Sequence, residues 1–207
     1  MATTSLSKAD RRGQIVDAAR KVFAEKGYYR AGVADIIQES GIARGTFYLY
    51  FTSKRAVFDA VLDDIFRRIH EQIRAIEVPD PWDEGAVLAQ LRGNAERLAT
   101  LMLADPRSVR VLFAEAAGLD EEAGVKLADF YGRLGQWVGE SLEDGIRLGI
   151  VRPCNPLVAA HALIGSLRGM LWAWAFGLVE LDQATLVQEA LRLARDGVLT
   201  TGREVRP

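Results

Sequence analysis

The sequence predicts an all-α protein with a helix-turn-helix domain at residues 1–52 and a larger helical-bundle domain at residues 53–207. Apolar residues recur at helical spacing in every long segment, which indicates about nine helices. No run of alternating apolar and polar residues lies between hairpin turns, which argues against strands. The chain has 207 residues, of which 49% are apolar, so it can bury a substantial core.

Three helices are expected in the N-terminal domain. The first begins near Ser7, which can cap it, and ends at Gly27. The second carries an apolar face from Val33 onward and stops at Gly41, and the third spans residues 44–51. Because a tight glycine turn joins the last two helices, they form a helix-turn-helix unit.

Six further helices are expected in the larger domain. Ser53 can cap the first of them, which links the two domains. Prolines and glycines separate the others, since neither residue continues a helix well. The predicted helices cover approximately residues 54–70, 82–104, 106–117, 125–148, 156–178 and 182–199.

The segment from Gly41 to Lys54 is the most informative about function. Phe47 and Phe51 are four residues apart and can share a buried face, so the polar side chains between them point elsewhere. Their hydroxyl, guanidinium and ammonium groups are donors that meet phosphate oxygens and base edges of DNA. The DNA-binding candidates are Arg30, Arg44, Gly45, Thr46, Tyr48, Tyr50 and Lys54.

The roles within this set differ. Arg44 and Tyr48 can reach base edges or grip phosphates, and the sequence leaves both open, because half or more of the hydrogen bonds to DNA go to its backbone. Thr46, Tyr50 and Lys54 are expected to position the backbone. For Tyr50, packing beside the neighbouring phenylalanine is an equal alternative.

The charge distribution agrees with a DNA-facing N-terminus. Residues 1–55 hold ten Lys and Arg against five acids, a net charge of +5. The remaining 152 residues hold sixteen basic and twenty-three acidic side chains, a net charge of -7. This asymmetry favours docking to a polyanion through one end.

Several classes of site are excluded or disfavoured. Cys154 is the only cysteine, which excludes an intrachain disulfide and a paired-cysteine metal site. We expect a cytoplasmic protein without cofactor or metal, because His70 and His161 are isolated and the N-terminus lacks a signal-peptide core. The most apolar stretch, residues 157–181, contains Arg168 and is expected to be a buried helix instead of a membrane span.

These residues together resemble the TetR family of bacterial transcriptional regulators. The resemblance is densest over residues 15–62 and rests on the patterns Ala18-Ala19-Arg20, Phe23 to Tyr28, Asp35-Ile36, Gly41, Gly45 to Tyr48, Tyr50-Phe51 and Ser53-Lys54. It implies a homodimer paired through its last two helices, which represses transcription until a small molecule enters the C-terminal domain. Two recognition helices would then enter successive major grooves of a pseudo-palindromic operator.

The chain departs from the family pattern at two helix starts. It has Ala31-Gly32 where the family commonly has threonine, and Ala43 where it often has serine. Alanine at an N-cap forgoes a hydroxyl, at a cost of roughly 1 kcal/mol. Phosphate contacts by such hydroxyls are impossible here, so arginine and lysine side chains are expected to carry more of the affinity.

The larger domain is rich in aromatic residues for an effector pocket, although most aromatic residues at helical spacing simply pack in the core. The candidates for ligand contact are Phe66, Met102, Phe113, Phe130, Leu134, Trp137, Arg168 and Trp172. Arg168 is open to three readings: it binds an anionic ligand, pairs with an acid such as Glu115, Glu140 or Glu143, or faces solvent.

Gly165 and Gly169 leave a flat strip where another helix can approach. We favour dimer packing there, with a close contact inside one subunit as the alternative. The predicted interface contains Ala162, Gly165, Ser166, Gly169, Leu186, Ala190 and Leu193.

The predicted function is a ligand-responsive regulator, taken to be a repressor, that binds operator DNA as a homodimer and is released by a small, apolar or aromatic effector. The alternatives are an activator, a regulator with no ligand response, and a ligand carrier with a vestigial head. An enzyme has little support, because the chain shows no HExxH, GxSxG, phosphate-loop or dinucleotide motif.

Overall fold

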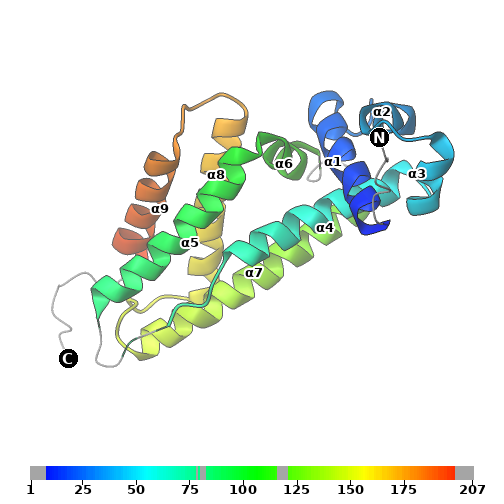
Figure 1. Cartoon of the computed structure of the whole chain (residues 1–207). Coiled ribbons are helices and arrows are strands. Elements are labelled where there is room, and N and C mark those ends of the chain that lie inside the picture. The colour runs from blue at the N-terminus through cyan, green and yellow to red at the C-terminus, as the bar shows by residue number, and fades with distance from the viewer. Residues whose placement is uncertain (1–7, 78, 80–82, 116–120, 199–207) are drawn as a thin grey trace, which may run out of the picture. The chain divides into compact units, whose positions relative to one another are not determined.

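The computed structural model describes residues 8–77, 79, 83–115 and 121–198. The described residues form nine α-helices and one π-helical turn, which confirms the all-α prediction (Figure 1). The helices are α1 (Lys8–Lys26), α2 (Val33–Ser40), α3 (Arg44–Tyr50), α4 (Lys54–Gln72), α5 (Glu84–Ala104), α6 (Pro106–Arg110), α7 (Glu121–Arg147), α8 (Pro156–Ala175) and α9 (Gln183–Val198), with the π turn at Val111–Glu115.

The boundaries agree with the sequence pattern wherever glycine, proline or a capping side chain marks them. Ser53 accepts a hydrogen bond from the Ala56 backbone N–H at 3.0 Å, as the predicted cap of α4 requires. The sequence predicted a single helix over residues 106–117. The structure instead has the short helix α6, followed directly by the π turn. Ser7, Trp82 and Leu199, which the sequence placed at helix ends, lie outside the described residues.

The chain divides into two compact units. Unit 1 comprises residues 1–68 and 106–125, and unit 2 comprises residues 69–105 and 126–207. Both α4 and α7 contribute residues to each unit. The predicted functional boundary at residue 52 is a different division of the chain and stays a prediction.

Unit 1 is built on an aromatic core. Phe23 of α1, Phe47 of α3 and Phe58 of α4 are each fully buried. The rings of Phe23 and Phe58 meet edge to face at 5.2 Å, the favoured geometry for aromatic pairs. α1 packs against α2 and against α6, and α2 contacts α3 (Figure 1). These contacts hold the helix-turn-helix unit on α1.

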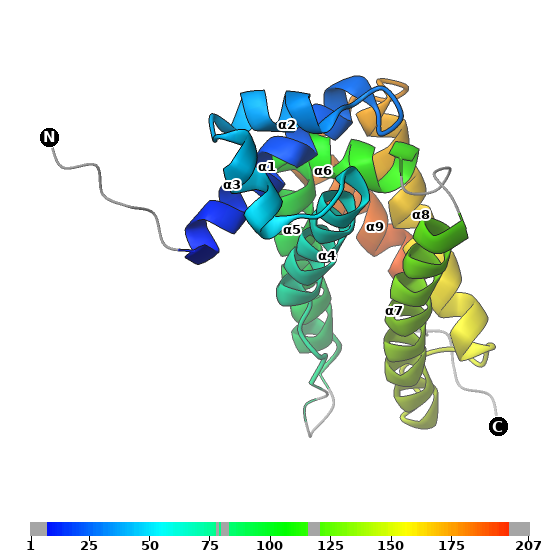
Figure 2. The ribbon, with the colours of Figure 1, turned by 90° about the vertical axis from the view of Figure 1, so that its right-hand side faces the viewer.

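Unit 2 is a helical bundle in which α9 packs against α5 and α8 (Figure 2). Glycines of α7 allow close approach of the chain at and before α8. A Cβ at Gly145 would lie 2.5 Å from Val151 Cγ2, and one at Gly135 would lie 2.5 Å from His161 Cε1. Both distances are below real Cβ contacts, so only glycine fits the observed backbone at these two positions without a shift.

The prediction of a buried helix at residues 157–181 is wrong for a single chain. α8 is long and apolar enough, by length and composition alone, to cross a membrane, yet only 11% of its most apolar window is buried. Apolar side chains remain exposed on it, including Leu157, Val158 and Trp172. An apolar helix face that its own chain leaves open marks an interaction surface.

Candidate DNA-binding and effector sites

The turn between α2 and α3 has the geometry of a helix-turn-helix connection. Gly41 adopts a left-handed conformation, φ 64°, which an L side chain adopts only with strain, and its N–H donates to the Gln38 carbonyl. Ala43 then sits in extended conformation as the N-cap of α3, with no side-chain cap. Ala43 thus occupies the N-cap position, as the sequence predicted, and it has no hydroxyl with which to cap α3.

The short α3 is anchored on one face and open on the other. Phe47 and, directly after the helix, Phe51 are buried at 0% and 4% exposure, as their spacing predicted. Arg44, Gly45 and Tyr48 are exposed. The Arg44 guanidinium lies over the Tyr48 ring at 5.8 Å, a cation–π contact that holds both donors on the same open face.

Other residues of α3 occupy intermediate positions. Thr46 and Tyr50 are half-buried. Leu49, which the sequence analysis did not single out, is 80% exposed and is the most open apolar side chain of the helix. An apolar group there can contact a thymine methyl in a major groove. Helical spacing from Phe47 gave the signal, since a residue two positions from a buried one faces away.

Lys54 has an internal role that its sequence position did not reveal. Its ammonium donates to the carbonyls of Tyr28 at 2.8 Å and Ala31 at 2.9 Å, and lies 4.4 Å from the centre of the Tyr28 ring. These contacts tie the start of α4 to the loop between α1 and α2. These two carbonyls already accept hydrogen bonds from the ammonium. They therefore compete with the phosphate contact that was expected for Lys54.

The start of α2 is capped in a way the sequence analysis missed. Gly32 is the N-cap, and Asp35 reaches back to accept its backbone N–H at 2.8 Å. Lys26 pairs with the same carboxyl at 2.7 Å. The hydrogen bonds from Lys26 and Gly32 hold the pKa of Asp35 below its ordinary value. Arg30 is exposed, and its Nε donates to the Lys26 carbonyl at 2.8 Å.

A buried charge connects α1 to α4 within unit 1. Arg20 is only 7% exposed and contacts the carboxylates of Asp17 and, at 3.5 Å, Asp64. Asp64 also meets Arg67 at 2.6 Å and Arg68 at 3.7 Å. Removing the carboxylate of a buried pair leaves an uncompensated charge, so Asp64 matters for the attachment of α4 to α1.

Unit 2 contains a cavity of about 810 Å³, within the range of small-molecule sites. Most of its wall is apolar, with a few polar groups that could orient a ligand. It is lined by Ile73, Ala75, Ile76, Val87, Leu91, Asn94, Trp137, Val138, Ser141, Leu142, Asp144, Gly145, Arg147, Leu148, Ile150, Val151 and Leu163.

The structure places one predicted ligand contact, Trp137, in the wall of this cavity. The other seven candidates do not line it. Phe66 and Phe113 belong to unit 1, and Met102 is buried in unit 2 at 3% exposure. Phe130 and Leu134 are half-buried, and Trp172 is exposed beside Phe176. The aliphatic residues after α4 and around the α7–α8 turn form the cavity instead, and their ordinary helical spacing gave no signal.

Arg168 is exposed, and its guanidinium lies 5.5 Å from the centre of the Tyr131 ring. Burial raises the pKa of Tyr131 to about 12, while the charge and hydrogen bond of Arg168 act in the opposite direction. Of the three readings, a solvent-facing arginine resting on an aromatic ring agrees best with these contacts.

The predicted dimer residues fall into two groups. Ala162, Gly169 and Leu193 are exposed, and Gly165, Ser166 and Ala190 are half-buried, so all six are accessible to a partner. Leu186 is 1% exposed and packs inside its own chain, so its side chain is not offered to a partner.

Comparison with known proteins assigns the N-terminal region. Residues 15–61 match the family model described as "Bacterial regulatory proteins, tetR family". The N-terminal region is a TetR-family DNA-binding domain. The matched residues cover most of α1, all of α2 and α3, and the first part of α4. They include the turn, the open face of α3 and the Lys54 contacts.

Curated bacterial regulators match the chain, two of them over most of its length and one over 30% of it. The transcriptional regulator HbdR of Aromatoleum is 28% identical over 204 residues, covering 92% of this chain and 82% of its own. The fatty acid metabolism regulator of Bacillus subtilis is 23% identical and covers 89% and 94%. The Bacillus subtilis regulator YvdT is 41% identical over 61 residues, 30% of this chain and 31% of its own. The protein is thus a DNA-binding transcriptional regulator.

Solved TetR-like structures share the fold. The fatty acid degradation regulator FadR of Bacillus halodurans superposes with a TM-score of 0.75 at 24% identity, covering 96% of this chain and all of that one. FadR of Bacillus subtilis, solved in complex with stearoyl-CoA, superposes with a TM-score of 0.71 at 23% identity, covering 87% and 96%. At these identities the likeness concerns the fold alone.

Proposed function

We propose that this TetR-family protein is a ligand-responsive repressor that acts in the cytoplasm, by binding and not by catalysis. It binds a pseudo-palindromic operator as a homodimer and is released by a small, largely apolar or aromatic effector. The observation that carries the ligand response is the cavity of about 810 Å³, whose wall includes Ile73 and Ile76, directly after α4.

The DNA-binding part of the proposal rests on the open face of α3 and on charge. Arg44 and Tyr48 present a guanidinium and a hydroxyl on this face, and the exposed Leu49 adds an apolar contact for thymine methyl groups. The first 55 residues carry +5 in a protein of net charge -2. Two such helices in a dimer would read half-sites roughly 34 to 36 Å apart.

The chain after α4 offers a route from the cavity to the DNA-binding helices. Two amide side chains of α5 fix its backbone: Asn94 bonds both the N–H and the carbonyl of Arg74, at 3.0 and 2.8 Å, and Gln90 does the same for Glu77 at 2.8 and 2.7 Å. Arg97 donates to the Gln72 carbonyl, in the last turn of α4, at 3.0 Å.

These ties make the end of α4 sensitive to α5. A ligand that shifts the cavity wall formed by α5 would also move residues 72–77, and α4 continues from there to Lys54 at the DNA-binding region. The ligand can weaken DNA binding only by as much as its affinity differs between the two positions of these helices.

The homodimer is supported by the exposed apolar side of α8, which includes Leu157, Val158 and Trp172, and by Leu193 of α9. An apolar effector is supported by the cavity wall. The Bacillus subtilis FadR structure contains stearoyl-CoA, so a long acyl thioester is a reasonable first compound to test.

The test begins with selection of an operator from a random duplex pool. Operator affinity and thermal stability are then measured with stearoyl-CoA and with a panel of apolar aromatic compounds. We expect at least one compound to raise the melting temperature and weaken operator binding together. A Val138→Phe variant, which fills the cavity, should lose both effects and keep its DNA affinity.

Two results would separate the alternatives. If compounds stabilise the protein and leave operator affinity unchanged, the coupling through α4 is wrong, and a regulator without a ligand response is favoured. If operator binding is strong and the protein raises transcription from a promoter carrying that operator, it is an activator.

A further inference from the structure

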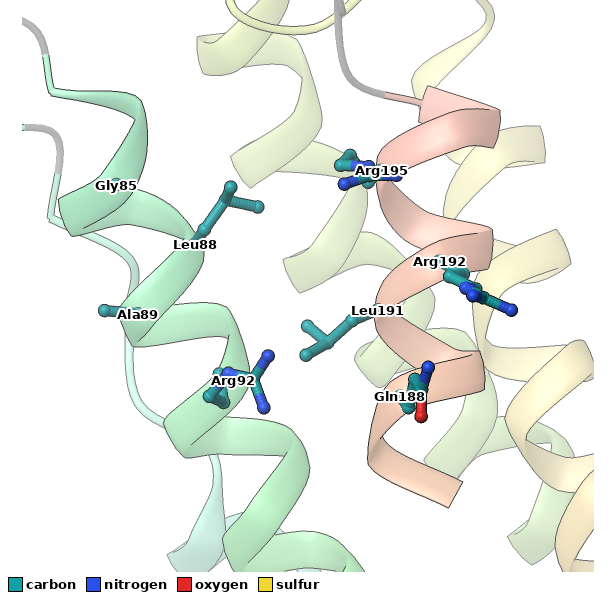
Figure 3. A pocket seen from close by; sticks show the side chains of 8 residues that line it. All are labelled: Gly85, Leu88, Ala89, Arg92, Gln188, Leu191, Arg192 and Arg195. Carbon is teal, nitrogen blue, oxygen red and sulfur yellow. The ribbon is translucent and has the colours of Figure 1, made fainter. Parts of the chain in front are cut away.

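A second hollow in unit 2 has a different chemistry from the effector cavity. It is a groove of about 510 Å³ between α5 and α9 (Figure 3). Among the residues that the structure describes, every charged side chain that lines it is an arginine, although unit 2 as a whole carries more acidic than basic residues. Its lining is Gly85, Leu88, Ala89 and Arg92 of α5, and Gln188, Leu191, Arg192 and Arg195 of α9.

The groove combines an apolar floor with a basic edge. In Figure 3, Leu88 and Leu191 point toward each other from the two helices, and the Arg92 side chain also projects into the gap. Arg195 lies on the side of α9 that faces α5, whereas Arg192 points away from the gap. Two guanidinium groups therefore border the apolar floor.

These two arginines form ion pairs with nearby acids. Arg92 meets Glu96 only at 4.0 Å, and Arg195 pairs with its chain neighbour Asp196 at 2.9 Å. Both pairs are well exposed, and exposed pairs of this kind contribute about 0 to 1 kcal/mol. An incoming anion could displace the local acids at small cost.

We propose that this groove is a binding site for a phosphate-bearing amphipathic molecule. Its apolar chain lies on Leu88 and Leu191, and its phosphate is held by Arg92 and Arg195. Guanidinium groups bind phosphate through paired, charge-assisted hydrogen bonds, and the excess of positive charge favours a dianion over a singly charged group.

The groove is separate from the effector cavity, so the inference goes beyond the proposed function. On α5 the cavity is lined by Val87, Leu91 and Asn94, whereas the groove is lined by Leu88 and Arg92, among others. At about 100° per residue these sets lie on adjoining sides of the helix. A ligand in the groove thus contacts the same helix as a ligand in the cavity, without sharing its space.

The groove also lies away from the surface expected to meet a second copy. On α9, Leu191 and Arg195 lie on one flank of the buried residues Leu186 and Val187, and the exposed Leu193 lies on the other flank. Leu193 belongs to the predicted dimer surface. A homodimer formed through that surface leaves the groove open.

The experiment is calorimetric titration of the full-length protein with dodecyl phosphate at concentrations where the compound is monomeric. Arg92→Gln and Arg195→Gln should each weaken binding about tenfold or more, since each removes a charge-assisted contact. Added salt should weaken binding to the wild type as well. Arg133→Gln is the matched control, because Arg133 is a surface arginine that pairs with Asp129 four residues away; it should bind like the wild type.

Three outcomes would overturn the proposal. The first is no binding by the wild type, or equal binding by all the variants. The second is loss of binding in Val138→Phe with no effect of the arginine variants, which would place the compound in the effector cavity. The third is dissociation of a dimer by Arg92→Gln or Arg195→Gln in light scattering, which would assign the groove to a second copy of the chain.

Discussion

At the scale of single residues, Lys54 shows how one ammonium group can serve the fold. It lies at the start of α4 and reaches back to the carbonyls of Tyr28 and Ala31, in the loop that precedes α2. The loop carbonyls thus obtain a charged partner, and one side chain links α4 to the loop between α1 and α2. Its neighbours in sequence did not indicate this role, since the partners are 23 and 26 residues away.

Replacing Lys54 by Gln should lower the free energy of unfolding by about 2 kcal/mol, because two carbonyls lose charge-assisted donors. Urea denaturation followed by circular dichroism measures the loss. Lys21→Gln is the control, because Lys21 pairs with Glu39 at an exposed position and should cost less than about 1 kcal/mol. Equal losses in the two variants would contradict a structural role for Lys54.

On α3 the prediction concerns binding and not stability. Arg44→Gln and Tyr48→Phe remove exposed donors while Phe47 keeps the helix anchored, so both variants should melt at the wild-type temperature. Operator affinity should fall by about tenfold for each donor that contacts DNA. Titrations over a series of salt concentrations tell the contacts apart: loss of a phosphate contact flattens the salt dependence, and loss of a base contact relaxes sequence preference. Unchanged affinity in both variants would remove α3 from the DNA interface.

At the scale of elements, the long helix α7 contains two glycines with opposite surroundings. Gly145 is buried, and its backbone carbonyl accepts the N–H groups of Ile150 at 2.9 Å and Val151 at 3.0 Å in the turn toward α8. A side chain at that position would meet Val151, which is itself buried and stiff at χ1. Gly132 is exposed, and a side chain there would meet nothing within 4 Å.

The two glycines should therefore respond to alanine with opposite signs. Gly145→Ala should destabilise the protein by about 1 to 3 kcal/mol through overpacking against Val151. Gly132→Ala should stabilise it by about 0.5 to 1 kcal/mol, because alanine favours the helix and restricts the unfolded chain. Thermal unfolding of both variants tests the pair, and a stabilised Gly145→Ala variant would mean that the turn toward α8 shifts freely.

Much of the element structure could be predicted from sequence because its signals are local. Gly41, Ser53 and Pro156 mark helix ends through conformation or capping, and the structure has a helix end beside each of them. Partners from elsewhere in the chain decided the rest. Asp35 pairs with Lys26 of α1, nine residues earlier in the chain, and the cavity collects aliphatic residues from α5, α7 and the segments near them. Of the predicted ligand contacts, Trp137 alone lines the cavity, so aromatic content did not indicate where the cavity lies.

At the scale of the whole molecule, one chain leaves α8 with apolar residues in water. Burying such residues is worth roughly 1.5 to 3 kcal/mol for each large side chain. At the small residues Gly165 and Gly169, the position that a Cβ would take has no neighbouring atom within 4 Å, so another helix can approach there. A second copy meeting this face would complete the burial that α8 lacks, and would supply the second DNA-binding head.

Gly169→Glu should separate the dimer. The glycine is exposed, and an added Cβ would meet no atom of another described segment within 4 Å, so the variant should fold, but a carboxylate in an apolar interface lacks a partner. We expect dimer dissociation to become at least about tenfold easier in analytical ultracentrifugation, with a parallel loss of operator affinity. Gly132→Glu, on the exposed side of α7, should leave the mass of the protein in solution unchanged. A dimeric Gly169→Glu variant would move the interface elsewhere.

The amide ties between α5 and the segment after α4 bear on how such a regulator could change its inducer. Asn94 and Gln90 hold the main chain of Arg74 and Glu77, and no side chain of the segment takes part in these bonds. Ile73 and Ile76 can therefore be replaced, and the cavity reshaped, while the mechanical connection survives. Under the proposed function, chemical selectivity and signal transmission would reside in different atoms of the same short stretch, so that one could diverge under selection while the other is conserved.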